Sequence, residues 1–434
     1  MQTKVSTLVI AAVLFASSAI SAPAQSASPG GGFTVTIPAS SKANPGDAGV
    51  RAHTNIRTLA TADQLSGTPA VSGPPFPGLF YEDPASIACL YSLAQPTPGC
   101  NPNAVSHNPP GGGRAIAIVD AYDDPNATTD LEGFAVQFGL NPVTSSNFSV
   151  VYAPAGGSSP GSCSGPATKP PVDPTGGWEV EESLDIEWSY AMAPRAKVYL
   201  VEAQSNSLLD LFCGATVASG LVEAAGGGEV SMSWGSGEFP QETLLDFLFT
   251  TPKVVYFAAA GDSPGPIWPS TSPNVVSAGG TTISRNPVTG NFELENVWQD
   301  AGGGPSAFEA RPAYQNAISG ITGPSRGTPD MATDSNPNTG VWVLDNFMPP
   351  SGCYPCWYIV GGTSVASPTL AGIVNSAGNF SASSTVELTN LYKLSSFYFN
   401  DITLGSCGLY LGYFAAPGWD FCTGLGSPHY AFGK

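Results

Sequence analysis

The stretch GGTSVASP (residues 361–368) joins two apolar segments of different character. Before it, residues 356–360 (CWYIV) form a short apolar run typical of a buried strand. After it, residues 364–378 (SVASPTLAGIVNSAG) are mostly small, which favours a helix packed closely on a sheet. The stretch predicts a strand–turn–helix unit with Ser364 at the helix N-terminus, where unpaired N–H groups favour negative charge. A simple N-cap role for Thr363 or Ser364 is the alternative.

Apolar runs and helical patterns alternate along the rest of the chain. The runs lie at residues 115–121, 148–153, 196–203, 228–235, 253–262 and 274–282, and the helical patterns at 127–139, 179–193, 207–221 and 239–250. Continuous apolar strands followed by helices indicate an α/β fold: a doubly wound, mainly parallel sheet with helices on both faces. In such a sheet, functional loops gather at the carboxyl ends of the strands. We expect one domain over residues 76–434.

The N-terminal region differs from this pattern. Residues 1–24 contain a lysine, the apolar run LVIAAVLFASSAI and small residues ending in SAPA, which is typical of a secretory signal peptide. Residues 25–75 are rich in Ser, Pro, Gly, Ala and Thr and indicate a linker or a reduced prosegment. We therefore expect a secreted protein, extracellular or periplasmic.

The charge balance limits the classes of molecule that this protein is expected to bind. The 434 residues include 33 acidic and 14 basic side chains, a formal net charge of −19. This balance argues against a nucleic-acid partner, because phosphate binding needs clustered cations. No run after the signal is long and apolar enough for a membrane span, so we expect no membrane association. We also expect a monomer. The acidic balance fits either general solubility or tolerance of low pH, and composition does not separate these.

Eight cysteines in a secreted chain favour disulfide bonds. Local pairing predicts four bonds: Cys89–Cys100, Cys163–Cys213, Cys353–Cys356 and Cys407–Cys422. Cys353 and Cys356 have a second interpretation as a redox dithiol.

A nucleophilic serine needs a base, and the three histidines, His53, His107 and His429, lack the His-Gly-Thr-His context of a subtilisin base. A carboxylate can serve instead. In residues 176–194 (GGWEVEESLDIEWSYAMAP), Glu181 and Asp185 lie four apart and project from one helix face, where sharing a proton relieves their repulsion.

Two structural alternatives remain for these acids. Acidic residues in a first helical turn also offset the helix dipole. Asp262, in FAAAGDSPG (residues 257–265), follows a buried strand and is either a turn residue or a protonated donor to an oxyanion.

Together these segments resemble the sedolisins, the serine-carboxyl peptidases, which have a subtilisin-like fold and use glutamate in place of histidine. The resemblance covers roughly residues 76–432 and runs through AIVDAYDDP, EVEESLDIEW, SMSWG, AAAGDS, WPSTSPNVVSAGGT, GGTSVASP and PGWDFCTGLGSP, in this order. It implies Glu181 as general base and acid, Asp185 as the acid that orients it, and Ser364 as nucleophile. It further implies Asp262 as oxyanion donor and Asp120 as a supporting partner of Glu181.

The resemblance also implies a calcium site near the C-terminus, in NDITLG and APGWD. Asp401 and Asp420 would supply carboxylate oxygens, and Ile402, Ala416 and Gly418 main-chain carbonyls. One feature departs from the family: sedolisins usually carry a long folded prosegment, whereas only residues 25–75 separate the signal from the domain.

The predicted function is an acid-acting endopeptidase that cleaves protein or peptide substrates. An inactive, calcium-stabilised binding or scaffold protein on the same fold is one alternative. A conventional subtilisin acting near neutral pH is the other, and it is disfavoured because no histidine is placed to serve.

Overall fold

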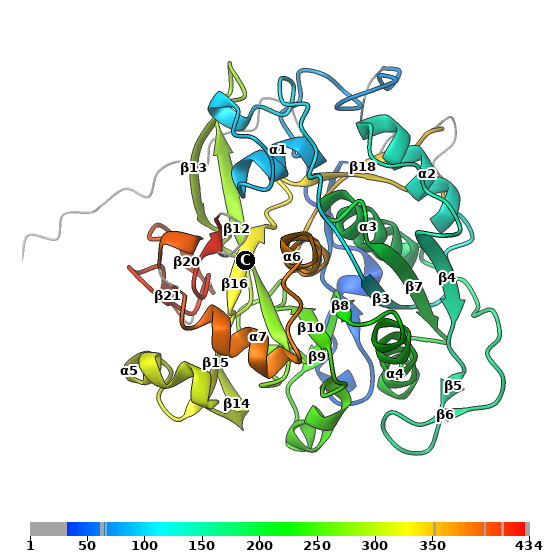
Figure 1. Ribbon diagram of the computed structural model, residues 1–434, viewed down its shortest axis with the longest axis vertical. Coiled ribbons are helices and arrows are strands. Elements are labelled where there is room, and N and C mark those ends of the chain that lie inside the picture. The colour runs from blue at the N-terminus through cyan, green and yellow to red at the C-terminus, as the bar shows by residue number, and fades with distance from the viewer. Residues whose placement is uncertain are drawn as a thin grey trace, which may run out of the picture.

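The computed structural model describes residues 33–60, 65, 67–349, 353–394, 396–408 and 412–429. Its centre is an eight-stranded sheet (Figure 1). In spatial order the strands are β13 (Phe292–Val297), β12 (Val276–Arg285), β10 (Val254–Ala259), β8 (Gly228–Met232), β3 (Ala115–Ala121), β7 (Lys197–Ala203) and β4 (Phe148–Tyr152), with β16 (Met331–Asp334) also paired to β12. All pairs are parallel except β12 with β13. The predicted, mainly parallel sheet is confirmed.

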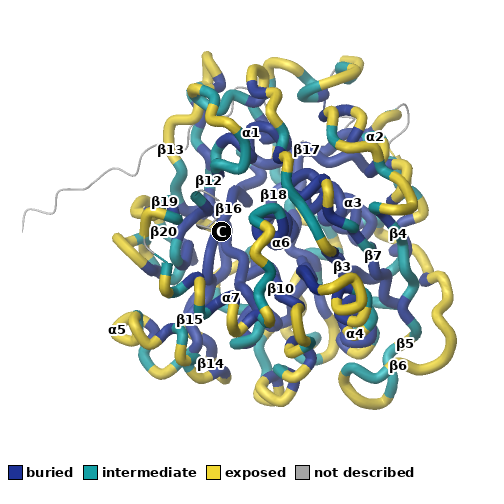
Figure 2. Tube along the Cα trace, viewed as in Figure 1, coloured by how far each residue is buried: buried dark blue, intermediate teal, exposed yellow. Residues whose placement is uncertain are grey.

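Helices cover both faces of this sheet, which explains its continuous apolar strands. Ile116 and Ile118 of β3 pack in one core cluster with α3 (Gly177–Met192) and α6 (Thr363–Ala377). Ala117 and Val119, on the opposite face, pack in a second cluster with α4 (Leu208–Ala224). The helix α2 (Ala127–Phe138) packs on the outer side of α3. Figure 2 shows α3 and α6 as buried, so side chains on these two helices meet away from water.

The remaining elements are short, and some of them, such as β17 and β18, are buried. They are η1 (Ala39–Ser41), η2 (Pro45–Asp47), β1 (His53–Thr54), β2 (Arg57–Ala60), α1 (Pro84–Leu90), η3 (Pro98–Cys100), β5 (Ala155–Gly156), β6 (Cys163–Ser164), β9 (Trp234–Gly237), η4 (Glu242–Phe249), β11 (Ile267–Trp268), β14 (Gly304–Ala310), η5 (Ala313–Ile318), α5 (Ser319–Thr322), β15 (Ser325–Thr328), β17 (Val341–Leu344), β18 (Trp357–Gly361), α7 (Ser384–Leu391), η6 (Ser396–Tyr398), β19 (Phe399–Asn400), β20 (Ser406–Cys407), β21 (Tyr413–Phe414) and β22 (Ser427–Pro428). The helix predicted at 239–250 is the 3₁₀ helix η4, and the run at 228–235 divides into β8 and β9.

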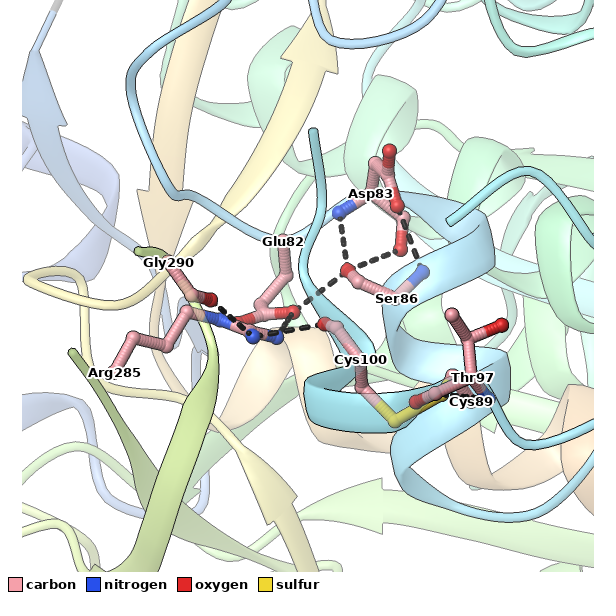
Figure 3. The surroundings of a disulfide bond; sticks show 8 residues. All are labelled: Glu82, Asp83, Ser86, Cys89, Thr97, Cys100, Arg285 and Gly290. Atoms are coloured by element: carbon pink, nitrogen blue, oxygen red, sulfur yellow. Dashed lines mark hydrogen bonds and ion pairs between the residues drawn. A yellow bond between two sulfur atoms is a disulfide. The ribbon is translucent and has the colours of Figure 1, made fainter. Parts of the chain in front are cut away.

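All four predicted disulfides are present, including Cys353–Cys356, which is therefore a disulfide here and not a dithiol. The Cys89–Cys100 bond ties α1 to η3 (Figure 3). Beside it, both oxygens of the buried Glu82 accept hydrogen bonds from Arg285 at 2.6 Å. This two-pronged ion pair links the segment before α1 to the end of β12.

Residues 33–60 are integrated into the same fold. Strand β2 pairs antiparallel with β18, and β1 pairs antiparallel with β9. We expect the domain to begin at residue 76 from the sequence, whereas these strand pairs include residues 53–60 in the same fold. The predicted signal peptide, residues 1–24, lies outside the described residues. Among the described residues, no helix combines the length and apolar composition that crossing a lipid bilayer requires.

Candidate active site

Ser364 lies at the start of α6, directly after β18 and a two-glycine turn. Gly362 has φ 110°, a left-handed conformation that side chains disfavour, and an added Cβ would collide with the Asn55 carbonyl oxygen. Ser364 is fully buried, and its hydroxyl donates to the Ser233 carbonyl oxygen at 2.9 Å. The predicted strand–turn–helix unit is confirmed, and it brings the serine to the carboxyl end of the sheet.

The acidic pair on α3 is also buried. Glu181 and Asp185 have no exposed surface, and α3 packs against α6. Burial raises the pKa of Glu181 well above its usual value, and the negative charges of Asp185 and Asp120 raise it further. The two side chains are not hydrogen-bonded to each other here: the Ser364 hydroxyl donates to the Ser233 carbonyl, and both buried oxygens of Glu181 are without a hydrogen-bond partner. The packing of α3 on α6 nevertheless brings both residues into one buried region.

Asp185 has a fixed partner. The Ser233 hydroxyl donates to Asp185 Oδ1 at 2.8 Å and lowers the pKa of Asp185, which burial and the charge of Asp120 raise well above its usual value. Asp120 ends β3, fully buried, and burial raises its pKa to about 8. These buried acids repel one another when charged, so the cluster favours retained protons.

Asp262 approaches the serine from the end of β10. Its Oδ1 accepts from the Thr363 N–H at 2.7 Å and from the Thr363 hydroxyl at 2.9 Å. Burial raises the pKa of Asp262 to about 7, and the Thr363 hydrogen bonds and the positive charge of Arg57 act against that rise. A methyl group on Gly362 would lie 2.6 Å from Asp262 Oδ2. Asp262 Oδ2 therefore lies beside Gly362, close to the backbone that leads into the N–H of Ser364.

Two contacts of the site were not predicted from the sequence. Ser233 connects Asp185 to Ser364, and its presence in the SMSWG segment was the available signal. Asn55 lies against Ser364 from the N-terminal segment, and no local pattern marks it. Of the histidines, His53 comes nearest in the chain to Asn55, and its ring bonds the Thr54 carbonyl at 3.0 Å.

The predicted calcium ligands lie on two connected C-terminal loops. Asp401 Oδ2 accepts from the Gly418 N–H at 2.9 Å, and Asp420 Oδ2 accepts from the Ala416 N–H at 3.0 Å. Ile402 follows Asp401 and is buried. The part of the chain that the structure describes contains no group of three or more His, Cys, Asp or Glu side chains suited to a metal. Any cation here would therefore depend on main-chain carbonyls.

A serine at the N-terminus of a helix, beside the carboxyl ends of the strands of a mainly parallel sheet, is the arrangement expected of a subtilisin-like fold. No family model matches the sequence. Kumamolisin from Bacillus sp. (strain MN-32) is 30% identical over 354 residues, 73% of this chain and 59% of kumamolisin. Tripeptidyl-peptidase 1 from Dictyostelium discoideum is 25% identical over 361 residues, 73% of this chain and 54% of that protein.

Among solved structures, Pseudomonas sedolisin complexed with two molecules of pseudo-iodotyrostatin superposes with a TM-score of 0.62 at 21% identity, covering 81% of this chain and 96% of sedolisin. The chain is thus similar in sequence to the sedolisins and has a sedolisin-like, subtilisin-like fold, as the resemblance predicted. It spans little more than half the length of kumamolisin and of the Dictyostelium peptidase.

Proposed function

We propose that this chain is a secreted serine-carboxyl endopeptidase that hydrolyses peptide bonds through an acyl-enzyme. The proposal is supported above all by the packing of α6, which carries the buried Ser364, against α3, which carries the buried pair Glu181 and Asp185. The similarity to sedolisins supports the same chemistry. The four disulfides fit an oxidising, extracytoplasmic compartment.

In this mechanism Glu181 accepts the Ser364 proton as Oγ attacks the substrate carbonyl carbon. For this step the pair must hold one proton and not two, so that Glu181 is ionised when it accepts; its raised pKa then suits the return of the proton to the leaving amine. Asp185 shares a proton with Glu181 and orients it, while Ser233 holds Asp185. Asp120 would be a supporting partner of the pair: when it is ionised, its charge raises the pKa values of Glu181 and Asp185.

The oxyanion would be bound by the Ser364 N–H and by protonated Asp262. Thr363 already supplies two hydrogen bonds to Oδ1, which leaves Oδ2 to carry the proton and to donate it. Only the acid form can donate. With a pKa of about 7, this group would be active in acid and would lose its function as pH rises.

We further propose that calcium binds the C-terminal loops. The ligands would be carboxylate oxygens of Asp401 and Asp420 and carbonyl oxygens of Ile402, Ala416 and Gly418, a hard all-oxygen set that suits Ca²⁺. The hydrogen bond from the Gly418 N–H to Asp401 supports this assignment because it already draws the two loops together. When bound, the ion would join these loops and stabilise the fold.

The test is hydrolysis of a denatured protein from pH 3 to pH 8, measured after incubation of the purified chain at pH 4. We expect acid-favoured hydrolysis that Ser364→Ala abolishes. Ser367→Ala is the matched control, because Ser367 lies on the same helix and bonds Ser231 at 2.8 Å, outside the proposed machinery. Hydrolysis that survives Ser364→Ala would exclude the mechanism, and none at any pH would favour the scaffold alternative.

A further inference from the structure

Ser233 connects the acid pair and the serine of the candidate active site. It directly follows β8 and precedes Trp234, the first residue of β9. Its hydroxyl donates to Asp185 Oδ1 at 2.8 Å, and its carbonyl oxygen accepts from the Ser364 hydroxyl at 2.9 Å. Because Asp185 lies on α3 and Ser364 on α6, this one residue bonds to a functional side chain of each helix.

The acid pair receives one hydrogen bond from the described residues. Ser233 donates it to Asp185 Oδ1, and the other three carboxyl oxygens of Glu181 and Asp185 have no partner there. Both side chains are fully buried. They take part in none of the four ion pairs in the part of the chain that the structure describes. Within those residues, the Ser233 hydroxyl is therefore the donor that stabilises a negative charge on the pair.

The ionisable groups that act on the pair are acids. Asp120, at the end of β3, raises the pKa values of Glu181 and Asp185 through its charge. Asp262, which follows β10, raises the pKa of Glu181 further. Burial is the largest cause of both rises. All these influences favour the addition of protons to the pair.

The other buried acids around α3 act mainly on one another. The charge of Glu202, on β7, raises the pKa of Glu182. The charge of Asp130, on α2, raises the pKa of Glu187. These neighbours therefore do not oppose the protonation of Glu181 and Asp185.

The proposed mechanism requires one proton on the pair, and this requirement is hardest to meet in acid. If both carboxyls are protonated, Glu181 cannot accept the Ser364 proton. A hydrogen bond donated to an ionised carboxylate favours the ionised form. The Ser233 hydroxyl acts in this direction and lowers the pKa of Asp185.

The position of Ser233 is fixed by the sheet. Ser233 and Trp234 are both fully buried. The Trp234 indole N–H donates to the Val119 carbonyl at 2.7 Å, which anchors the end of β8 to the end of β3. The Ser233 hydroxyl also lies 3.2 Å from the Ser364 carbonyl oxygen. The folded chain therefore holds this donor beside Asp185 in advance of the reaction, as a preorganised site requires.

We propose that Ser233 is a positioning residue that keeps the second proton off the Glu181–Asp185 pair in acid and so sets the lower pH limit of hydrolysis. This inference rests on the proposed function and deepens it. Because Ser233 donates to Oδ1, Asp185 Oδ2 is the oxygen left to share the remaining proton with Glu181. No bond within Ser233 forms or breaks during the reaction, since it acts through Asp185.

The experiment measures kcat and KM for a labelled, denatured protein from pH 2 to pH 7, after incubation of the purified chain at pH 4. The lower pH limit is the pH at which kcat is half maximal on the acid side. In Ser233→Ala we expect this limit to rise by about one pH unit, the effect of one hydrogen bond to a charged group. Below both limits kcat should then be about tenfold lower than in the wild type, with KM unchanged.

Ser231→Ala is the matched control. Ser231 is a fully buried serine on the same strand, and its hydroxyl bonds Ser367 Oγ at 2.8 Å. This variant should keep the wild-type limit. Ser233→Thr, which retains a donor, should bring the limit back toward the wild-type value. If Ser233→Ala does not fold, Ser233→Cys keeps the shape and weakens the donor, so a smaller rise of the limit is expected.

Three results would contradict the proposal. A limit that is unchanged in Ser233→Ala, with kcat lowered equally at every pH, would assign Ser233 a structural role and overturn this inference. An equal rise of the limit in Ser231→Ala would also overturn it, and in both cases Ser364-dependent hydrolysis leaves the peptidase function standing. If hydrolysis survives Ser364→Ala, or if the wild type hydrolyses nothing at any pH, the proposed function fails and this inference fails with it.

Discussion

Replacing Asp262 with asparagine tests the oxyanion assignment through pH. The wild-type carboxyl has to donate a proton, and its pKa is about 7. The contribution of the Asp262 donor to the rate should be fully present below that pH and should fall about tenfold per pH unit above it, because the protonated fraction falls tenfold per unit. At pH 9 the loss should reach ~100-fold, similar to the cost of removing one oxyanion donor.

The Asp262→Asn variant keeps the geometry and removes the titration. The amide oxygen can accept the two Thr363 hydrogen bonds, and the amide nitrogen then occupies the Oδ2 position and donates at every pH. We expect lower activity than the wild type at pH 4 and no decline between pH 7 and pH 9.

The assay is the initial rate of hydrolysis of a denatured protein from pH 4 to pH 9, after incubation of the purified chain at pH 4. Each sample is also returned to pH 5 to show that the decline is reversible. Asp300→Asn is a second informative variant, because the charge of Asp300 raises the pKa of Asp262. Removing that charge should move the alkaline decline of the hydrolysis rate to lower pH. An alkaline decline in Asp262→Asn identical to that of the wild type would refute the assignment.

Three further predictions address the base, the fold and the cation. Glu181→Gln should lower the hydrolysis rate at least ~100-fold without moving the melting temperature downward, because it removes the proton acceptor and a buried charge; near-normal rates would exclude it as base. Asp83→Asn should raise the urea midpoint of unfolding at pH 8 and leave it unchanged at pH 4, since asparagine caps α1 as well as aspartate does. Burial raises the pKa of Asp83 to about 7. The stabilisation from its proton is therefore fully present below the ordinary pKa of 3.8 and is lost as pH rises through 7, which changes the free energy of unfolding by up to ~4 kcal/mol. A chelator should lower the melting temperature of the wild type and not of Asp401→Asn, and equal shifts in both would count against the calcium site.

Much of the fold was predictable because its signals are local. The run 115–121 is β3 from end to end, and α2 and α4 begin within a residue of their predicted starts. Cysteine pairing followed the same locality, since neighbours in sequence close short loops at little entropic cost. The type of η4 was missed, because a 3₁₀ helix and an α-helix have similar side-chain patterns over eight residues.

The residues of the candidate site also fall into two groups, those that the sequence indicates and those that only the fold brings together. The sequence by itself determined the chemical groups, because Ser364 at a strand–helix junction and acids four apart on a helix are patterns of spacing. Only the tertiary structure decided that Asp120, Ser233 and Asn55 join them, since these contacts cross many residues and depend on strand order and register. Burial, which raises the pKa values of these carboxyls, is likewise a property of packed layers, and no segment possesses it before the chain has folded.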